Sequence, residues 1–424
     1  MTTNENNRWL IAAAGVVMQI ALGAVYAWSV FRIPLTKQYH YTVSQGTLVF
    51  EIAILTLGFA AFLGGLWMKK AGPRLVGIVA GVCYGMGTVL AGQFAANFVL
   101  FCLAYGILGG VGLGLGYIIP VATLIKWFPD KRGMITGIAV AGFGAGALVT
   151  APIAAHLIKS VGIPETFGIL GICYFCAVVG AAIFLKNPVE GYSPAGWQPA
   201  VNHQGQQRAA KDHTFQEALS TWQWYALWGI LFLNTTAGIS IISQASPMAQ
   251  EISHVTPAVA AGLVGIISIT NGSGRFLWAW FSDLIGRRQV FLAMFLLQSV
   301  LFFFLSQAEN FTLLSVLAAV ILLCYGGGFG TMPAFAADYF GASNIGSIYG
   351  LMLTAWGFAG VVGPALIAHL REETGHYGEA LHIIAFIMLV STLLALVVRP
   401  PKAQGAQDGP RPSSSPLPFV PHHR

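Results

Sequence analysis

Charged residues are scarce in this chain. Of its 424 residues only 8% are Asp, Glu, Lys or Arg, against about 25% in soluble domains, and 56% are hydrophobic, with mean hydropathy +0.71. This composition excludes an ordinary soluble protein and predicts a polytopic helical membrane protein. Acidic residues are absent from the middle of every long apolar run: Glu51, Glu251 and Glu309 fall toward one end of their runs, and Asp283 and Asp338 toward the other.

Cysteines and catalytic motifs are equally sparse. The five cysteines lie in apolar runs, and Cys173 and Cys176 form a lone CxxC, so we predict core packing residues and no disulfide framework. No HExxH motif, acid pair or Ser/His/Asp set falls at membrane depth, which argues against an enzyme, and no metal or cofactor is predicted. The first apolar run has no small-residue cleavage site before Arg32, so it is predicted to be a retained helix.

Hydrophobic runs of about 20 residues, long enough to cross a bilayer core of about 30 Å, recur along the chain. They lie near 9–31, 46–68, 75–94, 98–119, 133–158 and 166–185, and again near 222–246, 258–281, 289–307, 311–335, 344–368 and 380–398. We therefore predict an all-α membrane protein of twelve transmembrane helices. Residues 1–186 form one six-helix bundle, 187–217 a cytoplasmic linker, 218–399 a second six-helix bundle, and 400–424 a disordered tail.

Basic residues predict the orientation in the membrane. With both termini inside, sixteen Lys and Arg residues fall on the cytoplasmic side, and only Arg32, Lys37, Lys159 and Arg371 fall outside. The positive-inside rule therefore predicts cytoplasmic termini in a membrane expected to be the bacterial inner membrane. The same bias explains the net charge of +6 without a nucleic-acid partner.

The two predicted bundles are related in sequence. The segments that start at Pro120 and Pro333 align without a gap at an offset of 213 residues, so that Gly133 falls on Gly346 and Gly144 on Gly357. A parallel repeat of six-helix halves is typical of secondary transporters, whose substrate site lies at the midplane between the halves.

Arg275 is the one charge predicted near the middle of a span. It lies eight residues before Asp283, which at about 1.5 Å per residue puts it roughly 12 Å from one membrane face. A charge at that depth costs a few kcal/mol and usually marks a substrate or ion path. Since no mid-span acid can pair with it, Arg275 is predicted to bind an anion, and its planar donor fork matches a carboxylate.

Asn271 and two aromatic residues of a later run are further candidates. Asn271 lies one turn before Arg275, where its amide could orient the guanidinium, donate to the substrate or make an interhelical hydrogen bond. Tyr325 and Phe329 are also four residues apart, in the glycine-rich CYGGGFG, where a ligand or a backbone can approach closely. We predict that the side chains of Arg275, Asn271, Tyr325 and Phe329 contact the substrate.

Three segments carry a family resemblance: QIALGAVYAWSVF (19–31), GLGLGYIIPVATLIKWFPDKRG (112–133) and NGSGR (271–275). With the repeat, they make nearly the whole chain similar to the major facilitator superfamily, and within it to the oxalate–formate antiporters and monocarboxylate transporters. The resemblance implies alternating access, a substrate carboxylate bound by Arg275, and aromatic residues that close over it.

The resemblance also implies a latch. WAWFSDLIGRR, from Trp278 to Arg288, is similar to the superfamily's loop motif between helices eight and nine. In that motif the acid, here Asp283, and the arginines, here Arg287 and Arg288, hold together the cytoplasmic ends of neighbouring helices. The matching loop of the first half, GLWMKKAGPR, departs from the motif because it has lysine where the acid usually lies.

Aromatic residues complete the predicted site, mainly by resemblance: Tyr26, Trp28, Tyr117 and Phe143 in the first half, and Trp356 in the second. The repeat places Phe143 opposite Trp356, so these two are predicted to close the cavity from both sides. Oxalate carriers of the family have a lysine where Trp356 stands. A dianion favours two buried cations, so a single arginine favours a monocarboxylate.

The sequence thus predicts a transporter of small monocarboxylates such as lactate, pyruvate or formate, embedded in membrane lipid. Proton symport is the preferred energetics, because an anion that neutralises Arg275 must still move against a negative interior. An oxalate/formate-type anion exchanger is the alternative and needs no proton carrier. A sugar or drug carrier is disfavoured by the scarcity of Asn, Gln and acids in the spans, and a receptor would bind its ligand without flux.

Overall fold

The structure, a computed structural model, describes residues 6–189, 191–194 and 212–401. Every regular element in these ranges is helical. The N-terminal half contains α1 (Asn6–Gly23), η1 (Ala24–Ala27), α2 (Trp28–Tyr39), α3 (Val43–Gln93), α4 (Phe98–Phe101), the π-helical η2 (Cys102–Gly109), α5 (Gly110–Trp127), α6 (Arg132–Val161) and α7 (Ile163–Phe184). The C-terminal half contains α9 (Trp222–Ser253), α10 (Pro257–Ile285), α11 (Arg287–Leu305), α12 (Phe311–Phe340), α13 (Ile345–Met352), α14 (Thr354–Thr374) and α15 (Gly378–Val397), and a short α8 (Phe215–Leu219) precedes it.

Ten helical stretches of the described residues are long and apolar enough to cross a membrane. One of them, Leu48–Gln93, is 46 residues long and breaks at Gly72, whose φ is +77° and which is followed by Pro73, so α3 covers two predicted runs. The helix α10, which carries Asn271 and Arg275, is not among the ten. Counting α3 twice and adding α10 gives the predicted twelve, a number that stays a prediction. Most of the predicted linker and the tail from residue 402 lie outside the described residues.

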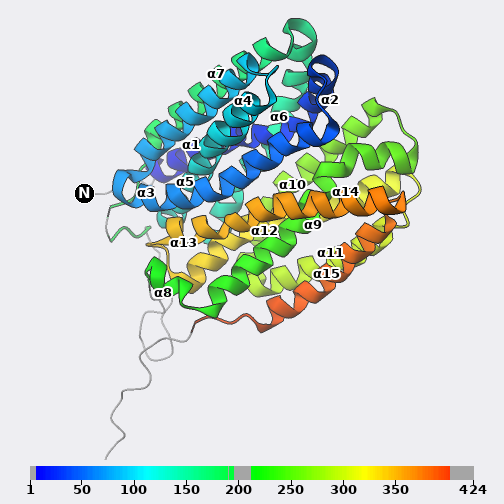
Figure 1. The fold of residues 1–424 in the computed structure, drawn as a ribbon. Helices are drawn as coiled ribbons and strands as arrows, with labels where there is room; N and C mark the ends of the chain where they lie inside the picture. The colour runs from blue at the N-terminus through cyan, green and yellow to red at the C-terminus, as the bar shows by residue number, and fades with distance from the viewer. Residues whose placement is uncertain (1–5, 190, 195–211, 402–424) are drawn as a thin grey trace, which may run out of the picture.

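The two halves lie side by side (Figure 1) and contact each other through two pseudo-equivalent sets of helices. In one set α6 packs against α10, and in the other α13 and α14 pack against α3. Glycines bring the backbones together: a Cβ on Gly144 would lie 2.5 Å from Cα of Gly272, and one on Gly65 would lie 1.8 Å from the carbonyl oxygen of Gly346. Such small-residue contacts let helices in lipid pack closely.

The outer surface of the bundle is apolar. Phe386 is 65% exposed and Leu393 60% exposed on α15, as expected for side chains that face lipid. Cys173 and Cys176 are exposed on α7, so the prediction that they pack in the core was wrong, because their face of the helix points away from the bundle. All five cysteines are free thiols.

One end of the molecule collects the charged contacts. Arg8 at the start of α1 pairs with Asp130 at 3.3 Å, and Arg288 donates to the carbonyl of Ala395 near the end of α15 at 3.1 Å. Figure 1 shows the start of α1, α8 and the end of α15 at this end, which we call the basic end. Arg371 pairs with Glu251 at the opposite end. That the basic end faces the cytoplasm remains a prediction.

Candidate functional site

Arg275 on α10 is fully buried, with no exposed surface. It is the only Lys, Arg, Asp or Glu among the buried side chains of the described residues. Its Nε donates to Oδ1 of Asn271 at 3.2 Å, one guanidinium nitrogen donates to the carbonyl of Val140 at 3.3 Å, and the other to the hydroxyl of Tyr26 at 3.4 Å. Within the described ranges no carboxylate pairs with it. A buried cation with only neutral partners is costly, and an anion beside it would offset that cost.

Two aromatic rings flank the guanidinium. Its central carbon lies 5.3 Å from the ring centroid of Phe143 on α6 and 4.8 Å from that of Phe329 on α12. Rings within about 6 Å attract a cation through their quadrupole and keep water away from it. The cation is therefore held between the halves.

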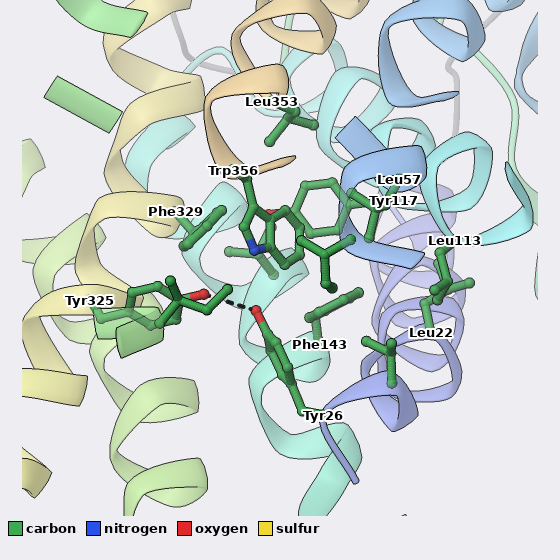
Figure 2. Close-up of a cluster of buried hydrophobic side chains, with 14 of the residues drawn as sticks. Leu22, Tyr26, Leu57, Leu113, Tyr117, Phe143, Tyr325, Phe329, Leu353 and Trp356 are labelled. Atoms are coloured by element: carbon green, nitrogen blue, oxygen red, sulfur yellow. Dashed lines mark hydrogen bonds between the residues drawn. The ribbon is translucent and has the colours of Figure 1, made fainter. Parts of the chain in front are cut away.

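Trp356 on α14 joins the aromatic side chains of both halves (Figure 2). Its ring centroid lies 4.7 Å from Phe329, 5.5 Å from Phe143, 5.4 Å from Tyr117 on α5, and 6.2 Å from Tyr26. The predicted approach of Phe143 to Trp356 is thus present, with their ring planes at 74°. The sequence repeat brings these residues together because they occupy equivalent positions in the two halves.

A pair of tyrosines bridges the halves beside Arg275. The hydroxyls of Tyr26 and Tyr325 lie 3.1 Å apart and are hydrogen bonded, as the dashed line in Figure 2 shows. Tyr26 belongs to η1, the 3-10 stretch that interrupts the first span, and Tyr325 lies on α12. Since each tyrosine comes from a different half, any separation of the halves at this level breaks their bond.

Nε1 of Trp356 is a buried hydrogen-bond donor without a partner among the described residues, and the buried hydroxyls of Tyr117 and Tyr349 interact only weakly, with each other and, for Tyr117, with Arg275. Both hydroxyls lie close enough to Arg275 to interact with it electrostatically. Buried polar groups without partners are rare in proteins and often mark a place that a ligand fills. The site therefore combines one cation with several neutral donors.

Tyr349 was not predicted from the sequence as a site residue. It lies on α13, seven residues before Trp356, and two turns of helix place both on one face. That spacing is the signal that could have identified it. Trp28, by contrast, lies away from Arg275: its Nε1 donates to the carbonyl of Gly46 at 2.8 Å, and its ring contacts are with Phe31, Phe101 and Tyr105.

The predicted latch residues form a network at the basic end. Asp283 accepts hydrogen bonds from the backbone amides of Gly133, at 3.2 Å, and Met134, at 2.8 Å, which are the first turn of α6. Arg287 lies 2.6 Å from Asp283 and 3.0 Å from Asp338. An acid at a helix N-terminus is stabilised by the free amides and the helix dipole, so these contacts tie α10 to α6.

Arg288, the third predicted latch residue, lies outside the contacts that Asp283 and Arg287 make. It donates to the carbonyls of Ala395 and Leu396 and so ties α11 to α15 within the C-terminal half. Among the described residues no group of three or more His, Cys, Asp and Glu side chains could hold a metal ion.

A helical membrane bundle with its buried charge between two related halves is typical of a secondary transporter. The chain belongs to the Major Facilitator Superfamily, whose family model matches residues 11–270 and 227–422. It is accordingly a transporter and not an enzyme.

Three relatives align with most of this chain. The Oxalate:formate antiporter of Oxalobacter formigenes is 25% identical, over 93% of this chain and 92% of that protein. Apicoplast pyruvate carrier 1 of Toxoplasma gondii is 28% identical, over 82% of each. Monocarboxylate transporter 12 of Rattus norvegicus is 23% identical, over 91% of this chain and 84% of that protein. These matches confirm the resemblance inferred from the sequence motifs.

A solved structure confirms the fold. The Escherichia coli Fucose:proton symporter FucP superimposes with a TM-score of 0.68, covers 92% of this chain and 98% of that one, and is 15% identical. At this identity the likeness concerns the fold alone.

Proposed function

We propose that the protein transports small monocarboxylates, of the lactate, pyruvate or formate type, by alternating access, and that Arg275 binds the carboxylate. The observation that carries the proposal is the fully buried guanidinium without an acidic partner among the described residues. One buried positive charge is neutralised by one carboxylate. The names of the relatives, which mention pyruvate, formate and monocarboxylates, support the same class of substrate.

The present contacts of Arg275 suggest how the substrate enters. Its three hydrogen bonds are 3.2 to 3.4 Å long and go to neutral acceptors. Charge-assisted bonds to a carboxylate are shorter, about 2.7–2.9 Å, and roughly twice as strong. A carboxylate therefore replaces Val140 and Tyr26, while Asn271 keeps the guanidinium oriented. The hydroxyls of Tyr117 and Tyr349 are donors for further substrate oxygens.

Proton symport is the proposed energetics, and anion exchange is the alternative. A monocarboxylate that neutralises Arg275 makes the loaded site neutral, yet the anion's charge still crosses the membrane unless a proton accompanies it. No acid among the buried residues of the described ranges can carry that proton. The proton then travels on the substrate or on the hydroxyl network around Arg275.

Counterflow in proteoliposomes tests the function. Vesicles loaded with unlabelled lactate, pyruvate, formate or oxalate are given the labelled compounds outside, with and without a pH gradient. We expect accumulation of the monocarboxylates and acceleration by an inwardly directed proton gradient. Trans-stimulation by oxalate alone would contradict the substrate class, and indifference to the pH gradient would leave exchange as the mechanism.

Trp356→Lys tests whether a single cation sets the substrate class. The indole is fully buried and lies 4.7 Å from Phe329, which itself contacts Arg275. A second ammonium there adds a charged hydrogen bond to a dicarboxylate, which contributes about 1.5–3 kcal/mol. We expect the ratio of oxalate to lactate uptake to rise at least about tenfold, since 1.4 kcal/mol corresponds to a factor of ten. Trp356→Met, which adds no charge, is the matched control and should leave the ratio unchanged.

A further inference from the structure

The latch at the basic end is asymmetric in sequence. Asp283, three residues before Gly286 (φ +98°), ties α10 to the first turn of α6, and Lys69, three residues before Gly72 (φ +77°), lies at the equivalent position of the N-terminal half. The equivalent helix start is that of α13 at Ile345, 213 residues after Arg132 at the start of α6. The loop of α3 therefore offers a lysine to a helix N-terminus that prefers an acid.

An acid from the linker lies at this place instead. Oδ1 of Asp212 accepts a hydrogen bond from the backbone amide of Ser343 at 3.2 Å, and Oδ2 accepts one from the Ser343 hydroxyl at 2.6 Å. Ser343 lies two residues before α13 begins. The neighbouring Gly341 has φ +83°, and a Cβ there would lie 2.0 Å from Oδ1 of Asp212, so the chain leaves room for the carboxylate.

The same linker segment is fixed to the C-terminal half by its backbone. The amide of His213 donates to the carbonyl of Phe340 at 2.9 Å, and the side-chain amide of Asn344 donates to the carbonyl of His213 at 2.8 Å. Asp212 therefore behaves as part of the turn between α12 and α13, although it is more than 120 residues earlier in the chain.

Basic residues of the N-terminal half face this turn. Lys69 donates to Oδ1 of Asn344 at 2.9 Å, and Lys126 at the end of α5 lies within electrostatic range of both Lys69 and Asp212. The ring of Phe215 on α8 also stacks on Phe62 of α3, with centroids 5.5 Å apart. The linker end thus contacts both halves at the basic end.

We propose that Asp212 replaces the acid that the first-half loop lacks, and that residues 212–217, the described end of the linker, thereby hold the basic end closed. The carboxylate caps the turn before α13 and offers a negative charge to the lysines of α3 and α5. When the basic end opens, α13 and the linker separate from these lysines, and the attraction is lost. Asp283 does the same at the pseudo-equivalent interface of α6 and α10.

Distance measurements between spin labels test this proposal. Labels at Leu75 and Val397, which are 49% and 61% exposed, report the separation of the two halves at the basic end in a background whose five cysteines are replaced by alanine. Asp212→Asn should raise the ratio of open to closed populations about three- to fivefold, the upper part of the range that an exposed ion pair contributes. Asp212→Glu, which keeps the charge, should leave the ratio within about twofold of the parent.

A compensating change makes the test specific. If the linker acid substitutes for the missing loop acid, Lys69→Asp should return the populations of Asp212→Asn to those of the parent. Ser343→Ala, which removes the hydroxyl from the other side of the contact, should open the basic end in the same direction. An unchanged distance distribution in Asp212→Asn, or opening that Lys69→Asp does not reverse, would overturn the proposal.

Discussion

Replacing Arg275 by lysine should lower the ratio of maximal transport rate to KM at least about a hundredfold. This corresponds to a loss of about 2.7 kcal/mol of transition-state stabilisation. The guanidinium makes three bonds in three directions, to Asn271, Val140 and Tyr26. A lysine ammonium keeps the charge but is a single point donor and cannot match a carboxylate bidentately. It also leaves Oδ1 of Asn271 without its partner in a buried place, where the lost bond costs about 1–3 kcal/mol.

Initial uptake of labelled lactate and pyruvate into proteoliposomes, beside the thermal melting of the purified protein, measures this effect. Arg371→Lys is the matched control, because its side chain is 39% exposed at the far end and pairs with Glu251. It should change uptake less than about twofold, as expected of an exposed ion pair. Uptake by Arg275→Lys equal to that of the parent would disprove the role of Arg275 in binding.

The sequence predicted the parts of this site that depend on helix periodicity and on the repeat. The four-residue spacing of Asn271 and Arg275 predicted that they share a helix face and left the role of the amide open; in the structure its oxygen accepts from the guanidinium. The spacing of Tyr325 and Phe329 likewise predicted a shared face, and their ring centroids lie 5.2 Å apart. The offset of 213 predicted that Phe143 lies opposite Trp356, and their ring centroids are 5.5 Å apart. These relations are local or symmetric, so a pattern of residue types reveals them.

The rest depends on how distant segments pack. The carbonyl of Val140 is a partner of Arg275 only because α6 crosses α10 at this level, and residue type says nothing about a backbone carbonyl. Tyr26 and Trp28 are two residues apart, and side chains at that spacing do not face the same side of a helix, so only one could reach Arg275. The linker acid Asp212 lies near α13 through tertiary contacts that no local motif encodes.

Replacing Gly330 by alanine should also reduce transport strongly, by about ten- to a hundredfold, although no charged or polar group is removed. A Cβ at this position would lie 1.9 Å from the carbonyl oxygen and 3.0 Å from the Cα of Arg275. The carbonyl of Gly330 also accepts a hydrogen bond from the hydroxyl of Thr136 on α6, at 3.0 Å. Alanine therefore forces α12 away from α10 and α6 together, and overpacking of this kind typically costs about 1–3 kcal/mol.

The effect on transport should exceed the effect on stability, because the backbone that moves carries the binding residue itself. A shift of about 1 Å in a group that positions a substrate can cost a factor of about a hundred, even where the fold survives. Gly265→Ala on α10, the helix that carries Arg275, is the control, since a Cβ there meets nothing within 4 Å, and it should transport like the parent. If Gly330→Ala lowers the melting temperature but its folded fraction transports at the parent rate, the backbone of Arg275 tolerates displacement. The close contact of α10 and α12 would then serve packing, and the position of the guanidinium would be set by Asn271 and Val140 instead.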